Sequence, residues 1–406
     1  MNEQGFFGLG IAPNLLSMLE RMKFASPTPI QHKAIPIAIE GKDVMGIAQT
    51  GTGKTIAFAV PMIQRLNNTR GRGLVIVPTR ELALQVDEVF QKFSGATGPG
   101  TAVLIGGASM NNQVRALRRM PRIIIATPGR LIDHLQQRTV RLDDVKILVL
   151  DEADRMLDMG FAPQISKILQ SVPKDRQTML FSATMPPEIM HIASSYMKLP
   201  VSVEVARSGT AVEKVVQELY IVQGENKKKL LEKVLQQYHG PVLLFSRTKY
   251  NASKIARYLR DLGHSAAEIH SDRSLSQRRE ALEGFKSGKY RVLVATDIAA
   301  RGIDVKGIEL VINYDIPEDP ENYIHRIGRT ARAGREGRAI SFAMPEQRAD
   351  VRAIEKLMMA VLPVSKHPEI PSGEFFNPPE QKPHPKGFLF RGMRNRNYGK
   401  RSRGRR

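Results

Sequence analysis

The chain has 406 residues, with 61 Lys and Arg against 40 Asp and Glu, so its net charge is +21. That length suits two domains of about 100–200 residues each, and the charge favours a polyanion such as nucleic acid over a membrane, because no apolar run of about 18 residues is present. The chain has no cysteine, which excludes disulfides and thiolate metal sites and is compatible with the cytoplasmic location that we expect.

Short apolar runs rich in β-branched residues recur along the chain, each followed by a longer helical pattern. The predicted strands of the first half are Asp43–Ile47, Leu74–Val77, Val103–Ile105, Ile123–Ala126, Ile147–Leu150 and Thr178–Phe181. Those of the second half are Val215–Val222, Val242–Phe245, Ala266–Ile269, Val292–Ala295, Leu310–Asn313 and Ala339–Phe342. Apolar runs without alternation predict strands covered on both faces, as in a parallel sheet between helices. Because strand and helix alternate in both halves, we predict an α/β fold with two tandem parallel-sheet domains.

Breaks in this pattern predict the domain boundaries. A polar stretch with a Ser-Gly turn signal lies at residues 204–213 and predicts a hinge between the domains. We therefore expect a first domain over residues 1–205, a linker over 206–212 and a second domain over 213–362.

The last part of the chain is predicted to be a flexible basic tail over residues 363–406. Its many prolines prevent a regular helix, and the stretch that follows them has too little apolar surface to fold alone. Residues 381–406 contain ten Lys and Arg and no Asp or Glu, so the tail is expected to bind a polyanion.

A glycine-rich loop directly follows the first predicted strand. It comprises Ala48, Gln49, Thr50, Gly51, Thr52, Gly53, Lys54 and Thr55. Its glycines let backbone N–H groups turn towards phosphate oxygens at a helix N-terminus, Lys54 can reach the β- and γ-phosphates, and the Thr55 hydroxyl can ligate Mg²⁺. A plain turn with a surface lysine is the alternative, but the position between strand and helix favours a phosphate loop.

A second nucleotide motif ends the predicted strand Ile147–Leu150. Two carboxylates at the end of a buried strand are costly unless they serve a metal or a reaction. We interpret Asp151 as the metal carboxylate and Glu152 as the base that polarises the attacking water. Asp154, two residues further on, could be a simple helix cap.

The literal Asp151-Glu-Ala-Asp154 sequence and the motifs around it make the chain similar to the DEAD-box RNA helicases, specifically the compact RhlE-type bacterial group. The resemblance covers about residues 6–362. It implies two RecA-like domains, ATP and Mg²⁺ as cofactors, RNA as a partner bound mainly through its backbone, and a monomer.

The resemblance also implies how the ATP base and ribose are held. Gln31 matches the residue that pairs with the adenine edge, and its amide can donate and accept at once. Phe6 stands where the family places an aromatic that stacks on adenine, although simple packing is the alternative. Asp304 matches the acid that binds the ribose.

Loops that follow successive strands match the family's RNA-binding motifs, whose hydroxyls, glycines and arginines fix a phosphate chain without reading its bases. The implied RNA contacts are Pro78, Thr79, Arg80, Gly107, Thr127, Arg130, Thr248, Arg278 and Thr296. One position departs from the family: Leu275 stands where the Gln-x-x-Arg motif has Gln.

The second domain has no phosphate loop, so we expect the two halves to share one ATP. By resemblance, Arg329 and Arg332 are arginine fingers that neutralise charge on the γ-phosphate. His325 and Arg326 are implied to join the domains, and so are the hydroxyl residues Ser182 and Thr184 at the end of a first-domain strand. Ala331 replaces the family's glycine between the two fingers.

These observations predict an RNA helicase that hydrolyses ATP to ADP and phosphate as its domains close, and that locally unwinds short RNA duplexes or remodels RNA–protein complexes. Two alternatives remain open: a processive DNA translocase of the same superfamily, and an ATP-gated RNA clamp. A simple RNA-binding module has no use for the phosphate loop.

Overall fold

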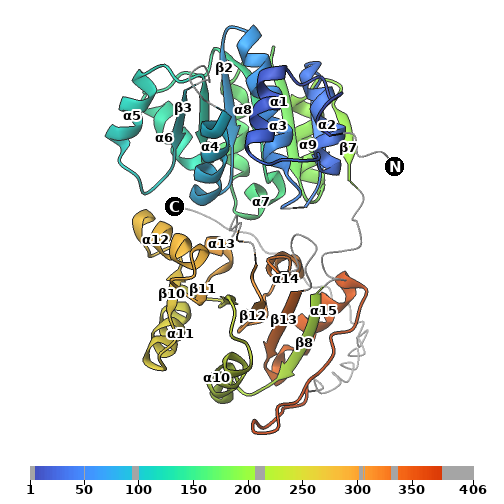
Figure 1. Ribbon diagram of the computed structural model, residues 1–406, viewed down its shortest axis with the longest axis vertical. Coiled ribbons are helices and arrows are strands. Elements are labelled where there is room, and N and C mark those ends of the chain that lie inside the picture. The colour runs from blue at the N-terminus through green and yellow to red at the C-terminus, as the bar shows by residue number, and fades with distance from the viewer. Residues whose placement is uncertain are drawn as a thin grey trace, which may run out of the picture.

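The computed structural model of the chain describes residues 5–49, 51–93, 100–205, 215–300, 305, 307–330 and 337–376. It contains two α/β domains, drawn one above the other in Figure 1, each built on a parallel sheet. The predicted linker over 206–212 lies outside the described residues. None of the helices in the described part of the chain is long and apolar enough to cross a membrane.

The first domain contains a parallel sheet whose strand order, within the described residues, is β3-β4-β2-β5-β6-β1-β7. The strands are β1 (Val44–Ile47), β2 (Arg72–Ile76), β3 (Thr101–Leu104), β4 (Ile123–Ala126), β5 (Val145–Leu150), β6 (Gln177–Ser182) and β7 (Val201–Glu204). The structure confirms the six strands predicted for this half, with small shifts at their ends. It adds β7, which pairs with β1 at the edge of the sheet.

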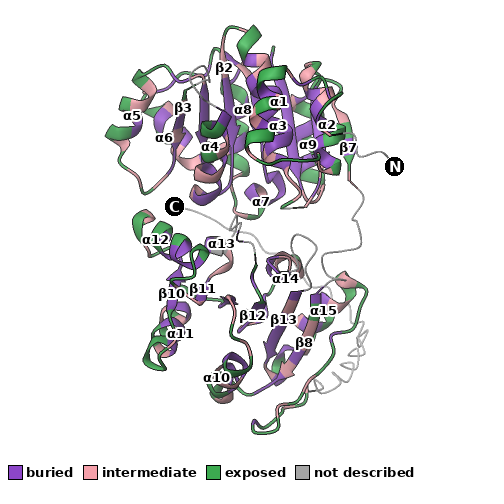
Figure 2. Ribbon diagram, in the orientation of Figure 1, coloured by how far each residue is buried: buried purple, intermediate pink, exposed green. Residues whose placement is uncertain are grey.

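Helices cover both faces of this sheet, and Figure 2 shows the strands buried between them. One face packs against α1 (Pro13–Arg21), α2 (Pro29–Ile39), α3 (Lys54–Asn68) and α4 (Arg80–Phe93). The other packs against α6 (Pro128–Gln136), α7 (Ala153–Asp158), α8 (Ala162–Ser171) and α9 (Pro187–Tyr196), while α5 (Met110–Arg118) lies near the sheet edge. Successive strand residues such as Leu74 and Val75 join opposite clusters, which is why the strand sequences are continuously apolar.

The second domain repeats the first, with the strand order β10-β11-β9-β12-β13-β8 among the described residues. Its strands are β8 (Val215–Ile221), β9 (Val242–Phe245), β10 (Ala266–Ile269), β11 (Val292–Ala295), β12 (Leu310–Asn313) and β13 (Gly337–Ala343). All six strands predicted for this half are confirmed. Apart from β7, the two sheets have the same order, so corresponding strands of the two domains can be compared directly.

Helices also cover both faces of the second sheet. One face packs against α12 (Leu275–Lys286), α14 (Pro320–Ile327) and α15 (Arg348–Met358). The other packs against α10 (Lys227–Gln237) and α11 (Lys249–Asp261). Short helical turns occur at α13 (Asp297–Ala300), η1 (Gly224–Asn226) and η2 (Pro345–Gln347).

Residues 363–376 lie against the second domain, whereas the sequence predicted a flexible tail from residue 363 onwards. Ser365 N–H donates to the Leu219 carbonyl and Leu219 N–H donates to the Pro363 carbonyl, both at 2.8 Å, so that Val364 pairs with strand β8. Ile370 is buried in the core. Proline prevents a helix, but it does not prevent an extended segment from pairing with an edge strand. The rest of the predicted tail, residues 377–406, lies outside the described residues.

Candidate active site

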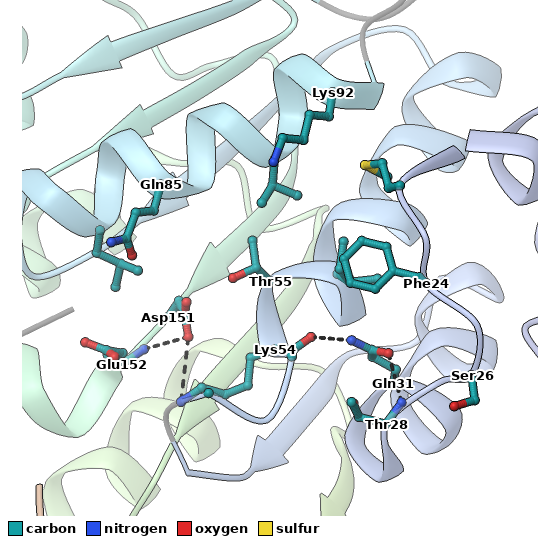
Figure 3. A pocket seen from close by; sticks show the side chains of 16 residues that line it. Phe24, Ser26, Thr28, Gln31, Lys54, Thr55, Gln85, Lys92, Asp151 and Glu152 are labelled. Carbon is teal, nitrogen blue, oxygen red and sulfur yellow. Dashed lines mark hydrogen bonds and ion pairs between the residues drawn. The ribbon is translucent and has the colours of Figure 1, made fainter. Parts of the chain in front are cut away.

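A pocket of about 610 Å³ opens in the first domain where the loops after β1 and β5 meet (Figure 3). The carboxyl ends of parallel strands share one edge of the sheet, and this edge is where α/β proteins bind nucleotides. The lining includes the predicted residues Gln31, Gly51, Gly53, Lys54, Thr55, Asp151 and Glu152. The structure thus brings the phosphate-loop residues and the strand-end acids together around one cavity.

The loop after β1 has the backbone that a phosphate loop requires. Gly51 and Gly53 have φ values of 87° and 89°, which glycine adopts without the strain imposed on other residues. The Thr52 hydroxyl donates to the Gln49 carbonyl at 2.7 Å and fixes the turn. Helix α3 begins directly after Gly53, so its free N–H groups and dipole favour an anion at this point.

Lys54 is the first residue of α3, and its side chain is only 6% exposed. Its Nζ donates to the Ala48 carbonyl at 3.0 Å and lies 4.0 Å from Oδ1 of Asp151. A separation of 4.0 Å is the outer limit of an ion pair, so the ammonium and the carboxylate face the same cavity without closing on each other. Thr55 follows Lys54 and lines the same pocket (Figure 3).

Gln31 connects helix α2 to the phosphate loop. Its Nε2 donates to the Gly53 carbonyl at 3.0 Å, and its Oε1 accepts from the Thr28 N–H at 2.9 Å. A Cβ on residue 53 would lie 2.3 Å from Nε2 of Gln31, so only glycine fits there. Gln31 therefore touches the loop that would hold the phosphates and also lines the pocket.

The aromatic residue that lines the pocket is Phe24, which was not predicted from the sequence. Phe24 is 38% exposed and its ring faces the cavity in Figure 3. Phe6, the predicted adenine-stacking residue, is 5% exposed, belongs to the first domain's core and is not among the pocket residues. A signal for Phe24 was present, because it begins the same segment that contains Gln31.

The two strand-end acids have opposite electrostatic environments although both are buried. Burial raises the pKa of Asp151 to about 6, and Lys54 only partly opposes the effect. Burial also acts to raise the pKa of Glu152, but Arg155, Lys54 and Arg329 outweigh it and lower the pKa to about 2. Arg155 Nη1 donates to Glu152 Oε2 at 2.5 Å. Glu152 therefore stays ionised at neutral pH, while the positive charge of Lys54 does not fully offset the burial of Asp151.

Asp154 connects the acidic segment to the end of β6, whereas the sequence alone allowed it to be a simple helix cap. Its Oδ2 accepts from the N–H groups of Ala183 and Thr184, each at 2.9 Å, and from the Thr184 hydroxyl at 3.1 Å. The Ser182 hydroxyl accepts from the Asp154 N–H at 3.1 Å. The predicted coupling residues Ser182 and Thr184 thus bind Asp154 of the acidic motif, and these hydrogen bonds lie within the first domain.

The second domain faces these acids through His325 and Arg329. Arg329 is 3% exposed, and its positive charge is one of those that lower the pKa of Glu152. Burial, Arg155 and Arg329 lower the pKa of His325 to about 4, although the carboxylates of Asp154 and Glu152 act to raise it. Residues of both domains therefore interact at one site, and His325 and Arg329 are among them.

Arg326 was predicted to join the domains, but its contacts lie inside the second domain. Its guanidinium is bidentate to Asp297, with Nε–Oδ1 and Nη2–Oδ2 distances of 2.6 and 2.7 Å. It also donates to Asn313 Oδ1 and to the Asp315 carbonyl. The Arg326 side chain is 1% exposed, and its guanidinium contacts order the helix that carries His325. Any effect of Arg326 on the coupling between the domains is therefore indirect. Asp297 was not selected from the sequence.

The predicted RNA-contact loops of the first domain lie at strand ends and contact one another. Thr79, which follows Pro78 and directly precedes α4, accepts from the Leu82 N–H at 3.2 Å. Gly107 has a φ of 75°, and a Cβ there would lie 2.3 Å from Arg80 Nη1. The Arg80 guanidinium therefore packs directly on the glycine loop.

Thr127 and Arg130 extend this surface at the start of α6. Arg130 Nη1 donates to the Ala108 carbonyl at 3.2 Å, and its Nε lies 3.4 Å from the Asp133 carboxylate. Thr127 is 8% exposed and precedes the first residue of the helix. Three separate loops thus lie next to one another at this edge of the first domain.

In the second domain, the predicted contacts are less uniform. Thr248 is exposed and caps α11 by accepting from the Asn251 N–H at 3.1 Å, and Thr296 directly precedes α13. Arg278 is 7% exposed and its Nη2 lies 2.8 Å from Glu81 Oε2 of the first domain. In this arrangement the Arg278 guanidinium serves an ion pair between the domains and does not face a surface where RNA could reach it.

Three predicted site residues lie outside the described residues: Thr50 of the phosphate loop, the ribose-binding candidate Asp304, and the second finger candidate Arg332, together with its neighbour Ala331.

The oxygen ligands in the pocket suit Mg²⁺. Thr55 contributes a hydroxyl and Asp151 a carboxylate whose raised pKa reflects insufficient positive charge nearby. Among the described residues, no group of three or more His, Cys, Asp or Glu side chains could hold a metal alone. Mg²⁺ usually keeps several waters and binds through one or two protein groups and substrate phosphates, so the residues present fit it.

A phosphate loop and strand-end acids in one parallel α/β domain, with basic residues of a second such domain facing them, define a two-domain nucleotide-dependent helicase. The chain matches the DEAD/DEAH box helicase model over residues 28–192 and the helicase conserved C-terminal domain model over residues 226–334. It therefore belongs to the DEAD-box helicases, and the predicted class of ATP-dependent RNA helicase is confirmed.

One similar relative is the DEAD-box ATP-dependent RNA helicase CshA of Geobacillus kaustophilus. It is 44% identical over 354 residues, which are 86% of this chain and 76% of that protein. The assignment to the RhlE-type group stays a prediction.

Two solved structures indicate how the domains are arranged. S. cerevisiae Dbp5 bound to RNA and ADP BeF3 matches with a TM-score of 0.80 at 31% identity, over 89% of this chain and 95% of that one. A DEAD box protein from Methanococcus jannaschii is 37% identical over 89% of this chain and 99% of that one, yet its TM-score is 0.52. The structure of this chain therefore superposes better on the complex with RNA and ADP BeF3 than on the Methanococcus jannaschii protein. The present arrangement resembles that of the complex with RNA and ADP BeF3.

Proposed function

We propose that the protein binds ATP in the first domain and hydrolyses it when closure brings Arg329 of the second domain to the γ-phosphate. The phosphates lie on the loop Gly51–Thr55 and the adenine lies between Gln31 and Phe24. The observation that supports this proposal most strongly is geometric: Arg155, which donates to Glu152, lines one small cavity together with His325 and Arg329 of the second domain.

Each charged residue has a distinct chemical role in this proposal. Lys54 compensates charge on the β- and γ-phosphates. Glu152, kept ionised by Arg155 and Lys54, orients the water whose oxygen forms the new bond to the γ-phosphorus while the bond to the bridging oxygen breaks. Arg329 stabilises the charge that develops on the transferred group.

Mg²⁺ is the proposed metal, and when bound it would neutralise phosphate charge. Thr55 and Asp151 are the residues that would hold it, because both present oxygen atoms to the pocket. Asp151 must be ionised for this role, and a bound cation favours the ionised form against the effect of burial.

RNA is proposed to lie along the strand-end loops of both domains. Arg80, Gly107, Thr127 and Thr248 lie on these loops and offer cationic, N–H and hydroxyl groups that suit a phosphate chain. The likeness to Dbp5 bound to RNA and ADP BeF3 supports this path. Closure on one strand would then separate a short duplex locally or displace a bound protein.

We further propose that the protein is a monomer, because one chain supplies both halves of the ATP site. We also propose a cytoplasmic location. The segment 381–406, with ten Lys and Arg and no acid, is proposed to add contacts with RNA phosphates. Analytical ultracentrifugation tests the monomer, and cell fractionation tests the location.

The direct test compares ATP hydrolysis with single-stranded RNA, with DNA of the same sequence, and without nucleic acid, followed by displacement of a short RNA duplex. We expect stimulation by RNA but not by DNA, and ATP-dependent displacement. Equal stimulation by DNA would favour a DNA translocase, whereas RNA-stimulated hydrolysis without displacement would favour an ATP-gated clamp.

A further inference from the structure

Helix α12 of the second domain begins with Leu275, a residue whose type departs from the family motif. Leu275 is half-buried and packs against the hydrophobic core cluster of the first domain. Every other member of that cluster among the described residues lies between residues 6 and 205. Leu275 therefore makes an apolar contact between domains.

The remainder of α12 shows that this contact belongs to the first turn of the helix. Arg278 lies one turn after Leu275, on the same side of the helix, and forms the buried ion pair with Glu81. Leu282 and Phe285 belong to the core of the second domain. The first turn of the helix thus presents Leu275 and Arg278 to the first domain, while residues further along the same helix pack in the second domain.

The nearby Gln277 does not replace the amide that the family has at position 275. Gln277 Oε1 accepts from the Ser274 N–H at 3.0 Å, and the Gln277 N–H donates to the Ser274 hydroxyl at 3.2 Å. These bonds form a capping box at the start of α12. At this point of the interface, the apolar side chain of Leu275 therefore stands where a polar group is expected.

We propose that Leu275 is a positioning residue that stabilises the closed arrangement through apolar contact and so sets how strongly ATP binding and RNA binding reinforce each other. This inference rests on the proposed function, because it assumes that ATP and RNA both favour closure. Apolar burial needs no RNA phosphate as a partner, so Leu275 acts on the domain arrangement and not on RNA contact. The coupling between the two ligands is the quantity that it changes.

The test uses full-length protein and measures RNA affinity with and without a nonhydrolysable ATP analogue. For Leu275→Ala we expect the gain in affinity caused by the analogue to fall about fivefold, the size expected for losing a half-buried leucine contact. Affinity without nucleotide and the melting temperature should not change. Leu275→Met should restore the gain, because it keeps volume and apolar character. Leu262→Ala, at a leucine that is 40% exposed at the end of α11, is the matched control and should match wild type.

An unchanged coupling in Leu275→Ala would overturn the proposal. A fall in RNA affinity without nucleotide would show that Leu275 contacts RNA, and a clearly lower melting temperature would place it in the core of its own domain, so both results also count against it. If the wild-type protein shows no stimulation by RNA, the proposed function fails instead, and the two failures can be told apart.

Discussion

The two domains contain the same pair of charged residues at matching positions, with opposite consequences. Lys54 begins the helix after β1 and faces Asp151 after β5, while Lys227 begins the helix after β8 and faces Asp315 after β12. Because the sheets have the same strand order, β8 corresponds to β1 and β12 to β5. The first pair is 4.0 Å apart and the second 3.1 Å.

The surroundings of the two carboxylates explain what each pair does. Asp315 also accepts from the Ser246 hydroxyl, the Arg247 N–H and the Asn251 amide, and burial is outweighed by Lys227 and these bonds, so its pKa is lowered. The pKa of Asp151 is raised to about 6, because its burial is not compensated. A carboxylate with several donors stabilises the fold, whereas Asp151, which accepts from the Glu152 N–H but whose burial is not offset, is available for a cation. The same scaffold therefore gives a structural pair in one domain and a ligand site in the other.

The same substitution at the two lysines should separate these roles and gives the largest expected effects. Lys54→Met should reduce turnover by at least about 10²-fold, the usual effect of losing one group that stabilises the transition state, and leave stability nearly unchanged. Lys227→Met should lower the free energy of unfolding by about 2–3 kcal/mol, less than for a fully buried pair because Asp315 is 18% exposed. Urea unfolding measures the loss of stability of both variants, and ATPase assays measure their turnover. Equal stability losses in the two variants would contradict the distinction between a ligand site and a structural pair.

Glu152→Gln sharpens the assignment within the first domain. We expect ATP to bind with near wild-type affinity, because the amide keeps the shape of the side chain, while turnover falls by about 10²–10⁴-fold without the carboxylate. Binding is measured with a fluorescent ATP analogue and turnover by phosphate release. Near wild-type hydrolysis in this variant would show that another group orients the water.

The raised pKa of Asp151 predicts a pH dependence of stability in the absence of nucleotide. Its folded-state pKa of about 6 lies above the ordinary value of 3.8, so its protonated form favours folding and this contribution is lost as pH rises through 6. Asp151→Asn should therefore be more stable than wild type at pH 7 by at most about 3 kcal/mol, with the difference disappearing near pH 4. His325, with a pKa of about 4, stays neutral from pH 6 to 8 and does not contribute there. A constant difference between pH 4 and 7 would contradict the assignment.

Deletion of residues 381–406 should have the smallest effect on catalysis. RNA affinity should weaken mainly at low salt, and the slope of log affinity against log salt should flatten by up to about 0.7 for each lost phosphate contact. Turnover at saturating RNA should stay the same, because both halves of the ATP site lie outside this segment. An unchanged slope would mean that the basic segment does not bind RNA.

The sequence predicted the regular part of the fold well, because strands covered on both faces are continuous apolar runs. Strand β7 was not predicted, because Val201–Glu204 alternates apolar and polar residues in four positions beside the predicted linker. The pairing of residues 363–376 was not predicted, because their prolines suggest disorder, although an extended segment can pair with β8. Both segments lie at corresponding sheet edges, next to β1 and β8, where pairing depends on tertiary structure more than on local pattern.

Within the site, contiguous motifs were predictable and contacts distant in sequence were not. The phosphate loop and Asp151–Glu152 follow their strands directly, so parallel topology alone brings them together. The bond between Arg326 and Asp297, and the ion pair between Arg278 and Glu81, join residues from separate motifs and required the structure. Phe24 lies in the same sequence segment as Gln31, which pointed to it, but the burial of Phe6 in the core was visible only in the structure.

The central claim is that one ATP is hydrolysed by residues of both domains, and Arg329→Ala tests it most directly. The measurement is turnover at saturating ATP and RNA, with Arg352→Ala on the exposed side of α15 as the matched control. We predict a loss of about 10³-fold in turnover for Arg329→Ala, less than a threefold change in ATP affinity, and no change in the control. RNA-stimulated turnover that survives in Arg329→Ala would contradict the claim and leave hydrolysis to the first domain alone.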